Sequence, residues 1–228
     1  MKFVDNLKEI NYGEAIYDGC YQEMERDESV FVYGLGVDDT KGHYGTSKDL
    51  HKVFGAKRSF DMPLSEDAMT GVGIGAALAG LRPIYVHQRM DFLLLCMNQL
   101  VNLASKMSYI SGGEYNVPLV IRAIIGRSWG QGAQHSQSFH SYFMHTPGIK
   151  VVAPSTPHDA KGCLISAIED NNPTIFLEHR MLYQNKGQVP KDIYRVNFNQ
   201  ARILSKGDDI TIIAISHMVV EALRAKDL

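Results

Sequence analysis

Cysteine and long hydrophobic runs are both scarce in this chain. Its 228 residues include only three cysteines, Cys20, Cys96 and Cys163, which lie far apart in apolar surroundings. Neither a disulfide framework nor a cysteine metal site is expected, and a reducing, cytoplasmic location is predicted. The longest apolar stretch, around residues 71–80, is too short and too rich in small residues to span a bilayer. The first residues lack the apolar core of a signal sequence, so no membrane segment is expected.

An excess of positive charge is also missing. The formal net charge is −2 and the pI is about 6.5, so the sequence has no basic footprint for nucleic acid and none is expected as a partner. The chain is 45% hydrophobic and 21% charged, which is typical of a globular protein. Its length suits one large domain, or one domain and a piece of another.

Helical and extended patterns alternate along the chain, which predicts the α/β fold class. The stretch at 117–125 is a nearly continuous apolar run, typical of a strand buried on both faces of a parallel sheet. Thr156 and Pro157 are a favourable cap and first residue for the helix that follows them. Right-handed crossovers between such units build a parallel sheet covered by helices on both faces. Helices are predicted over 12–27, 90–111 and 156–171, and strands over 29–37, 84–87, 117–125, 150–155 and 173–179.

The polar, irregular stretch at 180–199 predicts a linker, because Gly187 and Pro190 interrupt it. Beyond it, residues 201–228 predict a strand, a KGDD turn, a second strand and a helix. The predicted domains are therefore 1–195 and 196–228. So short a second piece cannot form a core of its own, so either the chain is a fragment or this piece packs on the main domain or on a partner.

A single carboxylate, Glu66, stands between a predicted strand end and a glycine-rich helix. Ser65 can cap that helix, which places Glu66 in the first turn, where the helix dipole favours an anion. The helix carries several glycines, at a cost of roughly 1 kcal/mol each, which indicates close approach of its backbone to another helix or to a flat ligand. Helix statistics alone favour the alternative that Glu66 is an ordinary surface carboxylate in the first turn.

The loop after 117–125 is rich in glycine and contains His135 within GQGAQHSQSF. A loop at the carboxyl end of a parallel strand is where α/β proteins bind ligands, which makes His135 a candidate site residue. A loop histidine without a role is the alternative. His140 and His145 fall in the next predicted helix, where packing or surface positions are expected.

Several of these stretches, taken together and in order, resemble one family: the beta subunit of the thiamine-diphosphate-dependent 2-oxo acid dehydrogenases of the pyruvate and branched-chain type. The resemblance covers nearly the whole chain. It implies a transketolase-like, pyrimidine-binding domain over 1–195, followed by the beginning of a transketolase C-terminal domain over 196–228. The stretches are DMPLSEDAMTGVGIGAALAGLRPIYV, MDF, SGGEYNVPLVIRA, GQGAQHSQSF, HTPGIKVVAPSTPHDAKGCLISAIEDNNPTIFLEHRMLY and KGDDITIIAIS.

The resemblance implies roles for four residues. Glu66 matches the glutamate that hydrogen-bonds a ring nitrogen of the aminopyrimidine and so activates the cofactor, a task that needs a partly desolvated carboxyl group. Phe92 matches the aromatic residue that packs on the pyrimidine ring, with an ordinary helix core residue as its alternative. Gln88 lies beside the same pocket. His135 matches the histidine that faces the thiazolium ring and the substrate, where it stabilises charge or passes a proton.

The resemblance also implies a structural potassium ion, bound by backbone carbonyls and side-chain oxygen. The matching positions are Leu119, Ala167, Ile168, Asp170 and Asn172.

The GDG motif with a later Asn, which holds magnesium and diphosphate in thiamine enzymes, is missing from the chain. The resemblance therefore implies an alpha subunit that supplies most of the magnesium site, a second beta subunit in a heterotetramer, and a lipoyl acyltransferase partner. Leu35 stands where the family commonly has an acidic residue, and the run VHQR replaces its usual residues, so His87 and Arg89 could suit a different substrate. Alternatives are a split transketolase-like or acetoin-cleaving enzyme, or a non-catalytic assembly subunit.

Overall fold

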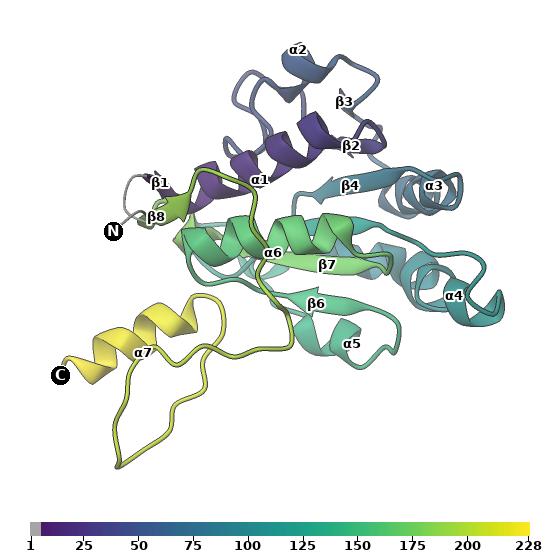
Figure 1. Cartoon of the computed structure of the whole chain (residues 1–228). Helices are drawn as coiled ribbons and strands as arrows, with labels where there is room; N and C mark the ends of the chain where they lie inside the picture. Colours follow the sequence, from purple (N-terminus) through teal and green to yellow (C-terminus); the bar gives the residue numbers. More distant parts are fainter. Residues whose placement is uncertain (1–5) are drawn as a thin grey trace.

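A six-stranded parallel sheet forms the centre of the protein in the computed structural model, which describes residues 6–228 (Figure 1). The spatial order is β3-β2-β4-β5-β7-β6. Because β3 and β4 lie on opposite sides of β2, the chain reverses direction across the sheet beside β2, at a topological switch point. The strands are β2 (Val30–Gly34), β3 (Ser59–Phe60), β4 (Arg82–His87), β5 (Val120–Ile125), β6 (Lys150–Val152) and β7 (Thr174–His179).

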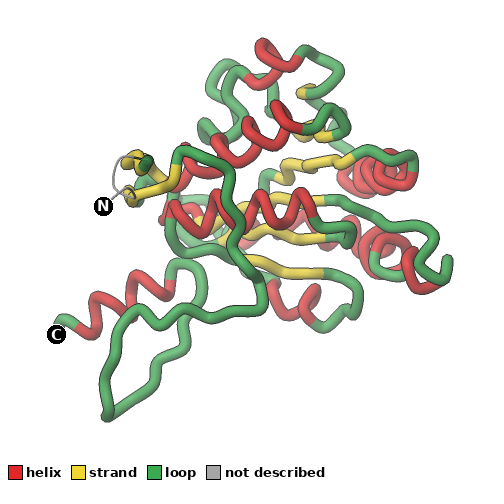
Figure 2. The backbone as a smooth tube through the Cα atoms, in the orientation of Figure 1, coloured by secondary structure: helices red, strands yellow, loops and turns green. Residues whose placement is uncertain are grey.

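Helices cover both faces of this sheet, as the α/β prediction requires. On one face, α1 (Tyr12–Arg26) and α6 (Pro157–Glu169) pack side by side, and their apolar residues share a buried cluster with inward-facing strand residues such as Val32 and Phe176 (Figure 2). The opposite face carries most of the other helices of the first 150 residues, around a second cluster. These are α3 (Glu66–Leu78), η1 (Met90–Cys96), η2 (Asn98–Ala104), α4 (Met107–Ile110) and α5 (His140–Met144). The short helix α2 (Leu50–Phe54), in the loop after β2, packs on the first cluster through Leu50 and Phe54.

The predicted helix over 90–111 is irregular. It begins as the 3₁₀ helix η1, continues as the π-helix η2 and ends as α4. Gly112 and Gly113 stop it with positive φ angles of 64° and 88°, as expected for glycine at a helix end. At two predicted caps the outcomes differ: Thr156 accepts a hydrogen bond from the Asp159 N–H, whereas Ser65 occupies the cap position of α3 without capping it.

The predicted linker at 180–199 is partly ordered structure. It contains η4 (Arg180–Leu182) and the strand β8 (Lys186–Pro190), which pairs antiparallel with β1 (Leu7–Asn11). Sequence reasoning missed β1 because a short strand with no fully buried residue has no apolar alternation to mark it. The buried Lys161 ammonium on α6 anchors the end of this pair by donating to the carbonyls of residues 190, 191 and 192.

The two strands predicted within 201–215 are absent from the structure. This stretch is an extended loop, and the helix α7 (Met218–Lys226) follows it (Figure 1). A strand requires a hydrogen-bonded neighbour, and no strand among residues 6–228 lies beside this stretch. Ile210, Ile212 and Ile213 are consequently exposed. In the same described part of the chain, no helix combines the length and apolar character needed to cross a membrane.

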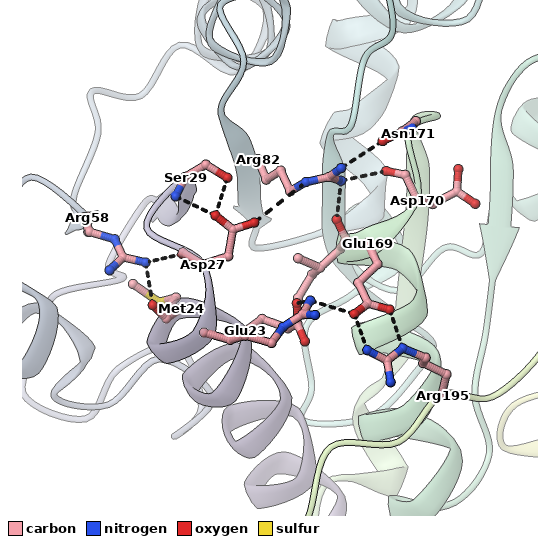
Figure 3. A network of polar contacts seen from close by, with 12 residues as sticks. Glu23, Met24, Asp27, Ser29, Arg58, Arg82, Glu169, Asp170, Asn171 and Arg195 are labelled. Atoms are coloured by element: carbon pink, nitrogen blue, oxygen red, sulfur yellow. Dashed lines mark hydrogen bonds and ion pairs between the residues drawn. The ribbon is translucent and has the colours of Figure 1, made fainter.

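Charged side chains are paired in a network at the amino end of the sheet (Figure 3). Arg82, the first residue of β4, donates to the backbone carbonyls of Ile168 and Asp170 and to the Asn171 side chain. Glu169 accepts from Arg195 and also pairs with Arg26. The network connects α1, β4, the end of α6 and the segment that leaves the domain, so it holds both helices against the sheet.

Candidate functional site

A cavity of about 650 Å³ opens at the carboxyl ends of the central strands. Its walls come from the loops after β2, β3 and β5, from the last residues of β4, and from the beginnings of α3 and η1. This position is the switch point beside β2, where open α/β sheets bind ligands. The lining residues are Leu35, Met62, Leu64, Glu66, Tyr85, Val86, His87, Gln88, Arg89, Phe92, Leu95, Gln131 and His135.

Glu66 lies in the first turn of α3, as predicted, and its half-buried side chain lines the cavity. Because α3 begins at the cavity, the free N–H groups and the positive end of its dipole lie at the same place as the carboxylate. The neighbouring Asp67 is exposed and is not part of the lining. The helix start therefore presents one carboxylate to the cavity.

Phe92 and His135 come from different elements and meet in the cavity. Phe92 belongs to η1 and His135 to the short 3₁₀ helix η3 (Ala133–His135), and their ring centroids are 5.3 Å apart in an edge-to-face arrangement. Gln88 follows β4 directly, and its amide donates to the Leu35 carbonyl at 3.1 Å. All four residues that the resemblance selected thus line one cavity, although 69 positions separate Glu66 from His135 in the chain.

His87 is a buried, neutral histidine. Burial lowers its pKa to about 4. Its Nδ1 lies 3.0 Å from the Arg89 carbonyl, so this nitrogen carries the proton and donates, and its Nε2 lies 3.8 Å from the Cys96 sulfur. The side chain therefore fixes the backbone beside Arg89 rather than offering a charge to a substrate.

Several cavity residues were not predicted from the sequence. Tyr85 is the most informative, because it lines the cavity and its buried hydroxyl has no hydrogen-bond partner among the described residues. Met62, Leu64 and Leu95 supply apolar surface. The sequence could have marked Gln131 as a candidate site residue, because it lies in the same glycine-rich loop as His135.

His140 and His145 lie outside the cavity lining. His140 is the first residue of α5, and partial burial lowers its pKa, while His145 is exposed just after the helix ends. Both positions agree with the prediction of packing and surface roles.

The five positions matched to a potassium site lie close together around the end of α6. Leu119 accepts from the Thr174 N–H, which places it beside the turn containing Asp170 and Asn172. Ala167 and Ile168 are in the last turn of α6, where carbonyl oxygens lack helical partners and favour a cation. Arg82 already donates to the carbonyls of Ile168 and Asp170, but each carbonyl oxygen has a second lone pair.

The comparisons with known proteins agree with this architecture. A family model, the transketolase pyrimidine-binding domain, matches residues 8–186. A split-gene transketolase, solved as an inactive beta4 tetramer, aligns with a TM-score of 0.74 over 96% of this chain and 67% of its own, at 21% identity. That likeness supports the fold alone.

Two relatives are similar in sequence. The pyruvate dehydrogenase E1 component subunit beta of Porphyra purpurea is 47% identical over 213 residues, which cover 92% of this chain and 64% of the relative. The acetoin:2,6-dichlorophenolindophenol oxidoreductase subunit beta of Cupriavidus necator is 44% identical over 92% of this chain and 65% of its own. The chain thus spans slightly less than two thirds of each relative.

The fold and the cavity at its switch point define an α/β protein with a binding site at the carboxyl ends of its strands, and the chain belongs to the transketolase pyrimidine-binding domain family. Within that family it is a homologue of the pyruvate dehydrogenase E1 beta subunits.

Proposed function

We propose that this chain is the beta subunit of a thiamine-diphosphate-dependent 2-oxo acid dehydrogenase, which decarboxylates a 2-oxo acid oxidatively and transfers the acyl group to a lipoyl carrier. The observation that carries the proposal is the convergence of Glu66, Gln88, Phe92 and His135 on one cavity. Bound thiamine diphosphate supplies the carbanion that attacks the keto carbon and accepts the electron pair released with carbon dioxide.

The cavity fits the pyrimidine half of this cofactor. Its apolar walls at Met62, Leu64 and Phe92 suit a flat ring, and the Tyr85 hydroxyl is a buried polar group without a protein partner. Glu66 would share a proton with a ring nitrogen, Phe92 would contact the ring, and Gln88 would hydrogen-bond beside it. His135, half-buried and in contact with Phe92, would exchange a proton with the substrate or the lipoyl sulfur.

The proposal includes an alpha subunit that holds the diphosphate and most of the magnesium site. In residues 6–228, no cluster of three or more His, Cys, Asp or Glu side chains is placed to hold a metal. On α3, a Cβ atom added to Gly71 or Gly75 would meet nothing within 4 Å, so both glycines face open space four residues apart. Such a face allows another helix to approach closely. A second beta subunit and a lipoyl acyltransferase complete the proposed assembly.

Three further elements belong to the proposal. Residues 196–228 are taken as the start of a transketolase C-terminal domain, and a cytoplasmic location agrees with three free, buried cysteines. Potassium is taken to bind at Leu119, Ala167, Ile168, Asp170 and Asn172. Thermal unfolding in potassium and in sodium chloride at equal ionic strength tests the last point, because a bound ion raises the melting temperature with its concentration. Equal curves would contradict it.

Calorimetric titration tests the function. Thiamine diphosphate with magnesium is titrated into the chain alone, into the chain mixed with its alpha subunit, and into the same mixture carrying Glu66→Gln. Binding and 2-oxo acid decarboxylation by the wild-type mixture only would support a shared site. Tight binding by the chain alone would contradict the role of the partner. Cleavage of acetoin in place of a 2-oxo acid would transfer the assignment to the acetoin-cleaving class, and no binding would favour an assembly subunit.

A further inference from the structure

Arg89 is a buried cation whose partners in the structure are all neutral. It follows β4 at the wall of the cavity and is 8% exposed. Its guanidinium donates to Gln131 Oε1 at 3.0 and 2.6 Å, to the Tyr44 hydroxyl at 3.0 Å and to the Gln88 carbonyl at 2.6 Å. Between residues 6 and 228, no carboxylate lies within 4.0 Å of it. Buried charges in proteins are normally paired, so this one is an exception.

A second arginine without an acidic partner lies behind the same wall. Arg180 is 2% exposed, donates to the carbonyls of Ser128 and His135 at 3.2 and 2.5 Å, and lies over the Trp129 ring at 5.1 Å. Its Nε is buried with no hydrogen-bond partner in the described structure. Burial lowers the pKa of Arg180, and the charge of Arg89 lowers it further. The two arginines therefore make this wall positive.

Asp91 acts on Arg180 through its charge, which raises the pKa of that guanidinium, but burial and the charge of Arg89 outweigh it. Asp91 Oδ1 accepts from the backbone and side chain of Gln137, and its Oδ2 has no partner among the described residues. Glu66 also lines the cavity, but forms no ion pair with Arg89. An anion that enters the cavity would thus meet an unneutralised guanidinium in a partly dehydrated site, where charge interactions are strong.

The loops that hold the arginines have unusual backbone conformations. Tyr44, Ser128 and Trp129 have φ angles of 52°, 111° and 61°, which non-glycine residues rarely adopt. The Tyr44 and Trp129 rings are 5.0 Å apart, so the loops after β2 and β5 meet around Arg89 and Arg180. Strained residues of this kind concentrate at ligand sites.

We propose that Arg89 binds a second anionic group, a carboxylate or a phosphonate, at the far end of a 2-oxo acid substrate. This inference rests on the proposed function and specifies its substrate class. The carboxylate next to the keto group is not a suitable ligand for Arg89, because it leaves as neutral carbon dioxide. A guanidinium bound to it would stabilise the starting state more than the transition state. A distal anion keeps its charge throughout the reaction, so binding it orients the substrate without opposing the chemistry.

The first test compares substrates of equal length in the holoenzyme, assembled from this chain, its alpha subunit, thiamine diphosphate and magnesium. The substrates are 2-oxopentanoate, 2-oxoglutarate and 2-oxo-4-phosphonobutanoate, which differ only in a terminal methyl, carboxylate or phosphonate. We expect a higher kcat/KM for one of the two anionic substrates, and that preference identifies the group. Arg89→Met should lower the ratio of anionic to methyl kcat/KM by about 30-fold or more. Arg89→Lys keeps the charge and should retain part of the preference.

The matched control is Arg127→Met, an exposed arginine on the same loop as Gln131 that does not line the cavity. This variant should keep the wild-type ratio. A wild-type preference for 2-oxopentanoate, with an unchanged ratio in Arg89→Met and Arg89→Lys, would overturn the inference and leave the proposed function intact. Thermal unfolding curves verify that each variant is folded.

A binding measurement separates failure of the inference from failure of the proposed function. Trp129 is the single tryptophan of this chain and lies between the two arginine sites. Glutarate has no keto group and cannot react, so it reports binding alone, with pentanoate as the uncharged-end control. We expect glutarate to change the Trp129 fluorescence saturably in an assembly with a tryptophan-free alpha subunit, and Arg89→Met to abolish the change. Glutarate binding without any 2-oxo acid decarboxylation would support the anion site and refute the proposed reaction. No response to glutarate or to 4-phosphonobutanoate, the matching phosphonate without a keto group, would refute the anion site.

Discussion

The arginines at the two ends of strand β4 differ in whether acidic groups lie around them. At its amino end, Arg82 is surrounded by carbonyl groups and an amide, within a network that includes the ion pairs of Glu169 (Figure 3). Just beyond its carboxyl end, Arg89 is more deeply buried and has no acidic partner in the described chain. The amino end pairs its charges, whereas the carboxyl end satisfies the hydrogen bonds of Arg89 but leaves its charge without an acidic partner.

The carboxyl ends of the strands also hold histidines whose pKa values are lowered. His43, His87 and His179 all lie beyond or at the carboxyl ends of strands, and burial lowers their pKa values to about 3, 4 and 4. Unpaired arginines, neutral histidines and strained backbone all lie at this end of the sheet. Each of these features lowers the stability of the folded protein, which is expected of a binding site.

The largest expected effect is on catalysis. Glu66→Gln should lower decarboxylation by the holoenzyme by about 10²-fold or more, because a carboxamide cannot share a proton. Its free energy of unfolding should stay within about 0.5 kcal/mol of the wild type, since Glu66 is a half-buried first-turn residue. Steady-state kinetics measure the decarboxylation rate, and urea unfolding measures the free energy of unfolding. Asp67→Asn, a change in the same turn outside the cavity, is the control, and equal losses in the two variants would contradict the role of Glu66.

The next largest effect is the difference in the free energy of unfolding between variants of Arg82 and of Arg89. Arg82→Met should lower the free energy of unfolding by about 1–3 kcal/mol, because it removes charge-assisted hydrogen bonds to Ile168, Asp170 and Asn171. Arg89→Met should change it by less than about 1 kcal/mol, because removal of an unpaired buried charge offsets the lost hydrogen bonds to Gln131, Tyr44 and Gln88. Urea denaturation of both variants measures the two free energies of unfolding. A larger loss in Arg89→Met would reverse the comparison.

The pH dependence of stability tests whether His87 is neutral in the folded protein. The pKa of His87 is about 4 in the folded protein and near its ordinary value of 6.5 when unfolded, so the unfolded chain binds the extra proton between these values. Stability should therefore be complete above pH 6.5 and fall as the pH decreases towards 4. His87→Gln should make this slope shallower by up to about 1.4 kcal/mol per pH unit.

Unfolding in urea at pH 5 and pH 7 measures the slope. His145→Gln, at an exposed position, is the matched control and should leave the slope unchanged. A wild-type slope in His87→Gln would show that this side chain does not resist protonation.

The smallest effect compares two faces of α3. A Cβ at Gly73 would collide with the Tyr33 hydroxyl, so Gly73→Ala should destabilise the chain, whereas Gly71→Ala meets open space and should stabilise it by up to about 1 kcal/mol. Gly71→Ala should also weaken assembly with the alpha subunit, if a partner helix packs there. Melting temperatures and sedimentation of the mixed subunits measure the two effects. Unaltered assembly would show that the glycine face is not an interface.

Sequence reasoning worked where a property is local to a few residues. The strand at 120–125 and the helix at 157–169 were predicted closely, because a continuous apolar run and a Thr-Pro cap specify these elements without distant contacts. It failed for β8 and for the strands expected within 201–215. Pairing decides those cases: β8 is a strand because β1 lies beside it, and 201–215 has no such neighbour among residues 6–228.

The candidate site shows the same limit. Glu66 and His135 could be selected as chemistry-bearing residues near helix and strand ends, and the resemblance added Gln88 and Phe92. No pattern in the sequence predicted that Arg89 would be buried against Gln131 and Tyr44 with no acidic partner, since those residues lie 42 and 45 positions away. The predicted substrate role of His87 also changes, because burial keeps it neutral.

The sequence by itself determined the α/β alternation, the caps and stops of several helices, and the residue types available for chemistry, because these depend on local propensity and hydrophobic period. Only the tertiary structure decided which of those residues share a cavity, which charges are paired and which histidines are neutral. Those properties depend on distance and on exclusion of water, and both are set when strands that are far apart in the chain become neighbours in the sheet.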